Sequence, residues 1–187
     1  MSTSSTIPRF PFHNQVKALS RVNRSRGELL VLDALPGYGK TAFLTKLKTE
    51  YETHKWRCSL ISLKRARSKM DTVIAAIEEI SSEAIEAPEN LQHALDILLE
   101  KLQSRQPQAL MFDDVHYLET EALDWVKCKL ARELEQELKD LTDDNFLLIF
   151  SGHSICGPTR WPTVRKPIKL TAFHREVINH FIEKNDI

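Results

Sequence analysis

The sequence predicts a three-layer α/β fold, in which a mainly parallel, five-stranded sheet lies between layers of helices. Apolar runs of strand length alternate along the chain with segments whose apolar residues recur every three or four positions, as on one face of a helix. The runs are continuously apolar, which is typical of strands buried on both faces. With 187 residues the chain is long enough for one domain with a sizeable core. We therefore expect a polar tail and a short helix over residues 1–27, and a single α/β domain over residues 28–187.

In the first half of the chain, each expected element is marked by its apolar spacing. Residues 1–11 are rich in Ser, Thr and Pro, and we expect them to be loose. A short helix is expected over 13–23, a buried strand over 28–33, and a helix over 40–54 with Phe43, Leu44, Leu47 and Tyr51 on one stripe. There follow a strand over 56–63, a helix over 71–81 with Val73, Ile74, Ile77 and Ile80 inside, and a helix over 90–103 that carries Leu91, Ala94, Leu95, Leu98 and Leu102.

The second half of the chain repeats this alternation. A strand is expected over 109–112, and a long helix over 120–139, because Leu123, Val126, Leu130 and Leu134 recur at helical spacing. A strand over 146–151 leads into a proline-containing loop over 152–166, then a short strand over 168–170 and a helix over 173–183. Parallel sheets bind ligands beyond the carboxyl ends of their strands. The polar residues that directly follow strands are therefore the candidate site residues.

The stretch DALPGYGKTAFL, residues 33–44, places two glycines, a lysine and a threonine where the first strand gives way to a helix. Glycine lets the backbone approach a phosphate chain closely, and the free N–H groups at a helix start attract negative charge. Lys40 would reach the terminal phosphates, and Thr41 would offer its hydroxyl to Mg²⁺. This is a Walker A loop in which Ala34 replaces the first glycine; an ordinary tight turn is the alternative. The expected phosphate-binding residues are Ala34, Leu35, Pro36, Gly37, Tyr38, Gly39, Lys40, Thr41 and Ala42.

The stretch ALMFDDVH, residues 109–116, is an apolar run that ends in two aspartates. In a parallel sheet both carboxylates would lie at the ligand edge. There Asp113 could hold Mg²⁺ directly or through water, and Asp114 could orient or deprotonate the attacking water. An apolar run before Asp-Asp is common, but downstream of a phosphate-binding loop it favours a Walker B motif. His116 is either close to the nucleotide or simply a polar loop residue.

The overall charge excludes a globally basic protein. Lys plus Arg and Asp plus Glu number 26 each, so no positive field attracts nucleic acid or an anionic membrane. A local basic run of Lys64, Arg65, Arg67 and Lys69 follows the second expected strand, and such a run is usually a solvated face. One nearby aromatic residue, Trp56, is too little for a base-stacking platform. We therefore do not expect a nucleic-acid partner, although the basic run leaves one open.

Cysteine usage and apolar run lengths indicate an intracellular, non-membrane protein. Cys58, Cys128 and Cys156 are far apart and form no C-x-x-C pair, which argues against a disulfide framework or a zinc site. The longest apolar runs are far shorter than the roughly 20 residues of a membrane helix. The absence of acidic residues before Glu28 is also a feature of organelle transit peptides, but a polar tail before a cationic helix is the simpler interpretation. We expect a cytoplasmic protein without a membrane partner.

Two segments, LLVLDALPGYGKTAFLTKL and ALMFDDVHYLET, resemble the STAND class of P-loop ATPases, the signal-transducing ATPases with numerous domains. The resemblance is to the branch with a GYGKT loop and a DDVH motif, and the related AAA-type ATPases share the phosphate-binding loop and the acidic strand. It implies a P-loop NTPase fold, ATP or ADP bound with Mg²⁺, protein partners or self-association, and slow hydrolysis that times a conformational switch. It covers roughly residues 28–183, including PIKLTAFHREVINHFI, which is similar to the segment leading to a helical lid in these proteins.

The sequence departs from the family pattern at positions that would couple the bound nucleotide to a change of conformation. The fourth expected strand ends in Ser151, Gly152 and His153, where the family commonly has an arginine that senses the terminal phosphate. Ser151 or His153 would be a weaker polar sensor, and a purely structural loop is the alternative. No complete lid or winged-helix domain is expected within the sequence. Arg160 and Arg165 are candidate arginine fingers for a neighbouring subunit, with a solvated loop charge as the simpler interpretation.

Three functions follow from these residues and this resemblance. The leading hypothesis is a Mg-ATP-dependent signalling or assembly switch that hydrolyses ATP slowly. The second is a nucleotide-binding scaffold without useful hydrolysis, favoured by Ala34 and by the missing arginine. The third is a DNA-associated AAA-type ATPase. Adenine is expected from the resemblance and because the chain has no N-K-x-D guanine-binding box.

Overall fold

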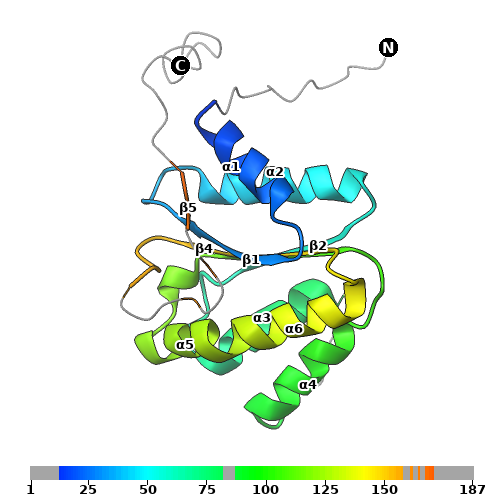
Figure 1. Ribbon diagram of the computed structural model, residues 1–187. Helices are drawn as coiled ribbons and strands as arrows, with labels where there is room; N and C mark the ends of the chain where they lie inside the picture. Colours follow the sequence, from blue (N-terminus) through cyan, green and yellow to red (C-terminus); the bar gives the residue numbers. More distant parts are fainter. Residues whose placement is uncertain (1–12, 82–86, 158–160, 162–163, 165–166, 171–187) are drawn as a thin grey trace, which may run out of the picture.

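The computed structural model describes residues 13–81, 87–157, 161, 164 and 167–170 (Figure 1). Its elements are α1 (His13–Arg24), β1 (Glu28–Asp33), α2 (Lys40–Thr53), β2 (Arg57–Ser62), α3 (Lys69–Ile80), α4 (Leu91–Lys101), β3 (Gln108–Asp113), the 3₁₀ turn η1 (Val115–Tyr117), α5 (Thr120–Trp125), the π-helical turn η2 (Val126–Leu130), α6 (Ala131–Thr142), β4 (Phe146–Gly152) and β5 (Ile168–Lys169). The expected alternation of strands and helices is confirmed. The tail expected over 1–11 and the helix expected over 173–183 lie outside the described residues.

The five strands form one sheet in the order β2-β3-β4-β1-β5, and each neighbouring pair runs parallel. The predicted α/β fold class with a parallel five-stranded sheet is therefore confirmed. Strand β4 lies between β3 and β1, and Leu32 of β1 stands in register with Ser151 of β4. This order brings the loop after β1, the acidic pair after β3 and the end of β4 to the same edge of the sheet.

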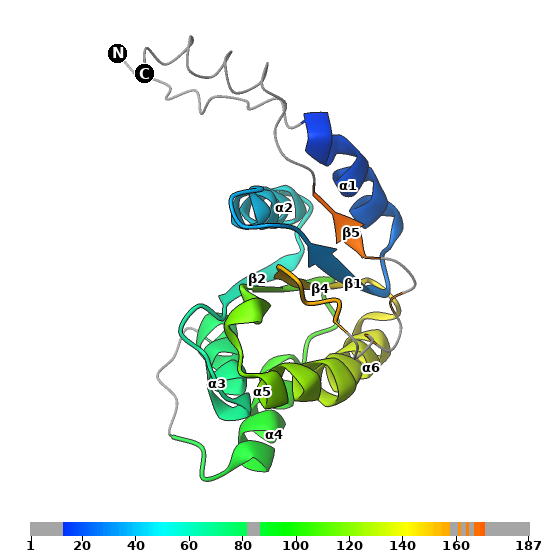
Figure 2. The same cartoon turned by 90° about the vertical axis from the view of Figure 1, so that its left-hand side faces the viewer.

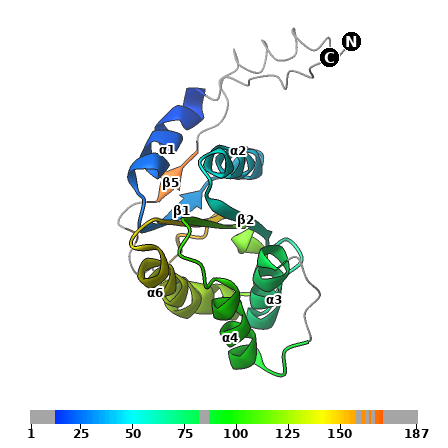
Figure 3. The same cartoon turned by 90° about the vertical axis from the view of Figure 1, so that its right-hand side faces the viewer.

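Helices cover both faces of the sheet and complete the three layers. In Figure 1, α1 and α2 lie above the sheet while α3, α4, α5 and α6 lie below it, and the side views of Figures 2 and 3 show the same separation. Alternate residues of β1 serve the two faces: Leu30 and Leu32 pack toward α2, and Leu29 and Val31 pack toward the larger helical layer. None of the described helices is long and apolar enough to cross a membrane.

The long helix expected over 120–139 forms, but it contains a π-helical turn. The N–H of Ala131 donates to the carbonyl of Val126, five residues back, where an α-helix would use a four-residue step. The extra residue rotates the helix surface, so that Lys127 is only 3% exposed although the apolar spacing places it outside. Leu123, which we expected inside, is half-buried, whereas Val126, Leu130 and Leu134 are buried as predicted.

Candidate functional site

The glycine loop between β1 and α2 has the backbone conformation that its sequence requires. Gly37 and Gly39 have φ angles of +79° and +75°, in the left-handed region that favours glycine. A Cβ atom on Gly37 would meet nothing within 4 Å, so glycine is needed there for the backbone conformation rather than for space. Gly39 caps α2, which begins at Lys40. The free N–H groups of the first helical turn therefore open toward the loop, as an anion site needs.

Lys40 is folded over this loop. Its side-chain Nζ donates to the backbone carbonyls of Ala34 at 2.8 Å and Leu35 at 3.0 Å, and the residue is only 8% exposed. Burial lowers the pKa of Lys40, whereas the carboxylates of Asp113 and then Asp114 act in the opposite direction. The lysine thus lies between the loop and the acidic pair, where its ammonium can meet a phosphate chain.

Ala34 occupies the position where the Walker A pattern has its first glycine, and the structure shows why alanine is accepted. Its φ is negative, so the backbone there does not require glycine. Its methyl group is buried in the apolar cluster beneath α2, and the residue is 8% exposed. Its N–H donates to the carbonyl of Gly152 at 3.1 Å, which ties the start of the loop to the end of β4. The replacement strengthens the base of the loop and leaves the glycines of the cradle in place.

We expect the substitution Ala34→Gly to destabilise the protein without improving nucleotide binding. It removes a buried methyl group and frees the unfolded backbone, which together lower the free energy of unfolding by about 1–2 kcal/mol. Urea unfolding measures the first effect and titration with a fluorescent ATP analogue the second. A tighter affinity for the analogue would show that alanine impairs the loop, contrary to this interpretation.

The acidic pair lies beside the loop, as predicted. Asp113, at the end of β3, is 2% exposed, and its Oδ2 accepts a hydrogen bond of 2.5 Å from the Oγ1 of Thr41. Its Oδ1 accepts from the backbone N–H of Asp114 at 2.9 Å. The two residues that we expected to hold Mg²⁺, Thr41 and Asp113, are thus in direct contact although 72 positions separate them.

Asp114 has a strained backbone. Its φ of 64° and ψ of 27° lie in the left-handed region, which costs a non-glycine residue about 1–3 kcal/mol and is concentrated at functional sites. This left-handed conformation redirects the chain from the end of β3 into η1. Burial first, and the neighbouring carboxylate of Asp113 second, raise the pKa of Asp114. A carboxylate with a raised pKa is a stronger base, as proton abstraction from water requires.

The end of β4 contributes the candidate sensors. Ser151 is 0% exposed, and its hydroxyl has no hydrogen-bond partner among the described residues. His116, just after the acidic pair, likewise has a buried Nδ1 for which the described part of the chain offers no partner. The rings of His116 and His153 are in contact, with centroids 4.2 Å apart. Burial first, and then His153, lower the pKa of His116, which favours a neutral imidazole.

Gly152, which sequence reasoning treated as part of the loop, has a packing role. A Cβ atom there would lie 2.6 Å from the Cγ2 of Ile155 and 3.3 Å from the backbone nitrogen of His116. Glycine therefore permits the turn after β3 to approach the end of β4. The glycine between Ser151 and His153 at a strand end was the only sequence signal for this close packing. That the packing partners are Ile155 and His116 is evident only from the fold.

The basic run and its aromatic neighbour were also only partly predicted. Lys64, Arg65 and Arg67 are exposed, whereas Lys69 forms an ion pair with Glu121 at 2.5 Å. The guanidinium of Arg67 lies over the ring of Tyr117, 5.6 Å from its centroid. Tyr117, rather than Trp56, is thus the aromatic residue of the basic surface. Trp56 is buried, and its ring is covered by the guanidinium of Arg26 instead.

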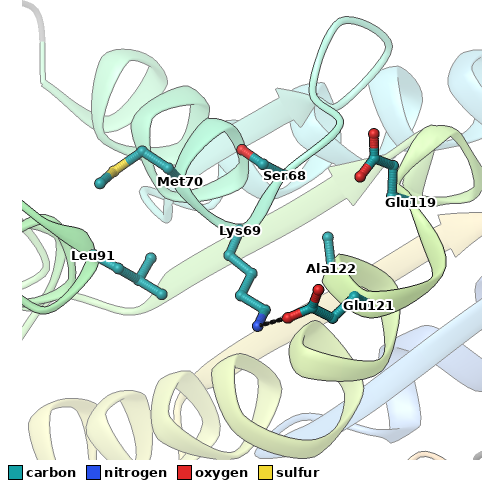
Figure 4. Close-up of a pocket in the computed structure, with 7 residues that line it drawn as sticks. All are labelled: Ser68, Lys69, Met70, Leu91, Glu119, Glu121 and Ala122. Carbon is teal, nitrogen blue, oxygen red and sulfur yellow. Dashed lines mark hydrogen bonds and ion pairs between the residues drawn. The ribbon is translucent and has the colours of Figure 1, made fainter.

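A pocket of about 290 Å³ lies apart from the glycine loop and the acidic pair, between the starts of α3, α4 and α5. Figure 4 shows the Lys69–Glu121 ion pair reaching from one of its walls to another. Its lining consists of Ser68, Lys69, Met70, Leu91, Glu119, Glu121 and Ala122. No residue of the glycine loop or the acidic pair lines this pocket. We therefore place the candidate site at the carboxyl edge of the sheet and not in this pocket.

The site suits Mg²⁺ only together with a phosphate ligand. Within the described ranges, no three His, Cys, Asp or Glu side chains are grouped so that they could hold a metal ion. Thr41 and Asp113 supply two oxygen ligands, and Mg²⁺ commonly takes its others from phosphates and water. The donor set therefore fits a metal that arrives with a nucleotide. Arg160 and Arg165, the candidate arginine fingers, lie outside the described residues.

Comparisons with known proteins give a family match and a fold similarity. Residues 23–156 match the model of a family described as an AAA domain. A search of curated protein sequences found no match. Among solved structures, the chain is similar to Cdc6p from Pyrobaculum aerophilum, with a TM-score of 0.68 and 20% identity over 97% of this chain and 51% of that one.

Two further structures show the same fold. The Aeropyrum pernix ORC1 protein in complex with DNA has a TM-score of 0.68 and 14% identity over 98% of this chain and 50% of that one. The Aeropyrum pernix ORC2 protein, solved as ADPNP–ADP complexes, has a TM-score of 0.62 and 12% identity over 96% of this chain and 52% of that one. The chain thus spans about half the length of these matched structures.

Proposed function

The chain belongs to the AAA domain family, and from this premise we propose that it binds ATP with Mg²⁺ and hydrolyses it slowly. The observation that carries the proposal is the contact between Thr41 and Asp113 beside the buried ammonium of Lys40. A lysine, a hydroxyl and a carboxylate converge there at the start of a helix whose loop exposes backbone N–H groups. This combination serves the binding of a phosphate chain and its metal.

In binding, the chain exchanges its internal contacts for contacts to the nucleotide. The ammonium of Lys40 leaves the carbonyls of Ala34 and Leu35 and turns to the terminal phosphates. Thr41 and Asp113, which bond each other, would hold Mg²⁺ through their side-chain oxygens. Bound there, Mg²⁺ would neutralise part of the phosphate charge. Glycines at positions 37 and 39 let the backbone N–H groups complete the cradle.

In hydrolysis, Asp114 is the proposed base. Its carboxylate accepts a proton from a water molecule, whose oxygen forms the new bond to the terminal phosphorus. The bond from that phosphorus to the bridging oxygen breaks, and ADP leaves with the bonding electron pair. The raised pKa of Asp114 suits this role. Ser151 is the proposed contact for the terminal phosphate, since its buried hydroxyl has no partner in the described part of the chain.

The experiment that tests the function is a titration with a fluorescent ATP analogue, with Mg²⁺ and then with excess EDTA. We expect binding with Mg²⁺ and at least about a tenfold loss of affinity without it, because two of the ion's ligands come from the protein. Phosphate release over hours measures the turnover. Binding without release would favour a nucleotide-binding scaffold, and equal affinity in EDTA would contradict the assignment of Thr41 and Asp113.

The finer role is a nucleotide-dependent switch of the STAND or AAA type that assembles with protein partners or with itself. The chain offers no arginine at the end of β4, where Gly152 and His153 follow Ser151. Control of such a switch would therefore depend on the polar residues at that place. Sedimentation of the protein with ADP and with a non-hydrolysable ATP analogue tests the assembly. The same sedimentation profile with both nucleotides would count against the switch.

A DNA-associated ATPase is the second candidate. One solved structure of this fold contains DNA, and so does another, the Drosophila ORC bound to DNA, at 13% identity and a TM-score of 0.59. These structures weigh against our expectation that nucleic acid is not a partner. On this chain, Arg67 stacked on the exposed Tyr117, with Lys64 and Arg65 beside it, is the surface that favours the candidate. The test is phosphate release from ATP at low salt, with and without DNA. An equal rate in both would contradict a DNA-associated function.

A further inference from the structure

Two buried polar atoms near the acidic pair have no hydrogen-bond partner among the described residues: the Oγ of Ser151 and the Nδ1 of His116. A buried polar atom without a partner costs about 1–3 kcal/mol, so such atoms are uncommon and call for an explanation. The backbone nitrogen of His116 lies against Gly152, whose carbonyl accepts a hydrogen bond from the N–H of Ala34, so His116 lies beside the start of the glycine loop. A rearrangement that gives these atoms partners would be favoured when a terminal phosphate enters.

His116 is also linked to the segment that follows β4. Its ring meets that of His153, with centroids 4.2 Å apart and planes inclined by 48°. Its backbone nitrogen lies over Gly152, where a Cβ atom would be only 3.3 Å away. A movement of His116 would therefore also displace the end of β4.

Ile155, two residues beyond His153, bonds an aromatic residue whose fluorescence can report on this contact. The indole Nε1 of Trp161 donates to the carbonyl of Ile155 at 3.2 Å, and its ring lies 4.9 Å from that of Phe150. Trp161 is 5% exposed. The end of β4 is thus linked to Trp161 in two steps: His116 contacts His153, and Ile155, two residues further along the chain, bonds Trp161.

We propose that the contact between His116 and His153 transmits the presence of a terminal phosphate from the nucleotide site to the hydrogen bond between Ile155 and Trp161. The proposal rests on the proposed ATP binding and assigns His116 and His153 as positioning residues. The terminal phosphate is the group that ATP has and ADP lacks. Entry of this group reorders Ser151 and His116, and the ring contact moves His153 and, with it, Ile155, whose carbonyl bonds Trp161.

The experiment uses the full chain with Trp56 and Trp125 replaced by phenylalanine, so that Trp161 is the only fluorescent indole. Its emission is recorded during titration with a non-hydrolysable ATP analogue and with ADP, both with Mg²⁺. We expect the ATP analogue, and not ADP, to change the emission. The variants are His116→Ala, His153→Ala, their combination and His153→Phe, and His93→Ala on α4 is the matched control.

The alanine variants are expected to lose the response and to reduce the preference for the ATP analogue over ADP by at least about fivefold, the lower limit of ordinary coupling between sites. The combined variant is expected to be no worse than either single one, because both interrupt one contact. His153→Phe keeps a ring against His116 and should keep the response. His93→Ala should change nothing.

The outcomes separate this inference from the function on which it rests. If the parent chain binds neither nucleotide, the proposed function fails and this inference with it. If the nucleotides bind and Trp161 responds equally in His116→Ala and His153→Ala, only the inference is overturned. A response lost in His153→Phe as well would overturn the role of the ring contact. If His116→Ala does not fold, the comparison of His153→Ala with His153→Phe decides the question alone.

Discussion

The substitution Lys40→Ala is expected to abolish nucleotide binding. The ammonium of Lys40 is the cation that bonds the loop carbonyls in the free protein, and it becomes the partner of the terminal phosphates on binding. Hydrogen bonds of a charged group contribute about 1.5–3 kcal/mol each, so losing two of them weakens the affinity by at least about 100-fold. Titration with a fluorescent ATP analogue and Mg²⁺ measures the loss.

The matched control for this prediction is Lys46→Ala. Lys46 lies on the same helix, beyond the glycine loop, and is exposed. Its removal changes the net charge equally and should leave the affinity within about twofold, because exposed charges are largely screened. Thermal unfolding of both variants separates lost binding from lost folding. An affinity of folded Lys40→Ala equal to that of the control would mean that the glycine loop is only a turn.

The substitution Asp114→Asn is expected to stop turnover while preserving binding. An amide cannot accept the proton of the attacking water, and a positioned base commonly contributes 10²–10⁴-fold, so phosphate release should fall by about that factor. Asparagine tolerates the left-handed conformation that Asp114 adopts, so the backbone at the start of η1 is retained. Affinity for the ATP analogue should be unchanged or somewhat tighter, because one negative charge near the phosphates is lost.

Asp143→Asn provides a control of the same chemistry. Asp143 is likewise an aspartate with a left-handed backbone, with φ of 53°, but it follows α6 near the start of β4, at the other edge of the sheet. Its substitution should affect neither binding nor phosphate release. If Asp114→Asn releases phosphate at the same rate as Asp143→Asn, Asp114 is not the base. If the unmodified protein also releases no measurable phosphate, the interpretation as a nucleotide-binding scaffold is favoured.

The local part of the nucleotide site was predictable because short stretches of chain encode it. A continuous apolar run gives a buried strand, two glycines give the left-handed turns, and Lys40 follows at the first helical position. The same holds for Asp113 and Asp114, since the end of an apolar strand in a parallel sheet points to the ligand edge. Ala34 illustrates the limit of such reasoning. The pattern treats it as a departure, yet it has a negative φ and a buried methyl group.

Contacts between distant segments were not predictable in this way. The π-helical turn at Val126 shifts the buried face of the long helix and draws Lys127 inward, because packing on the sheet overrides helical spacing. The stacking of Arg67 on Tyr117 joins a basic run to an aromatic residue that follows a different strand. Each depends on where another segment lies, which spacing along the chain does not specify.

The sequence by itself determined the fold class, the phosphate-binding loop and the acidic pair, because backbone conformation and hydrophobic periodicity act over a few residues. Only the tertiary structure decided that Thr41 bonds Asp113, that Gly152 admits His116, and that His116 meets His153. The physical reason is the strand order, which inserts β4 between β1 and β3. That order places the end of β4 against the turn that follows the acidic pair, and so creates the histidine contact on which our further inference rests.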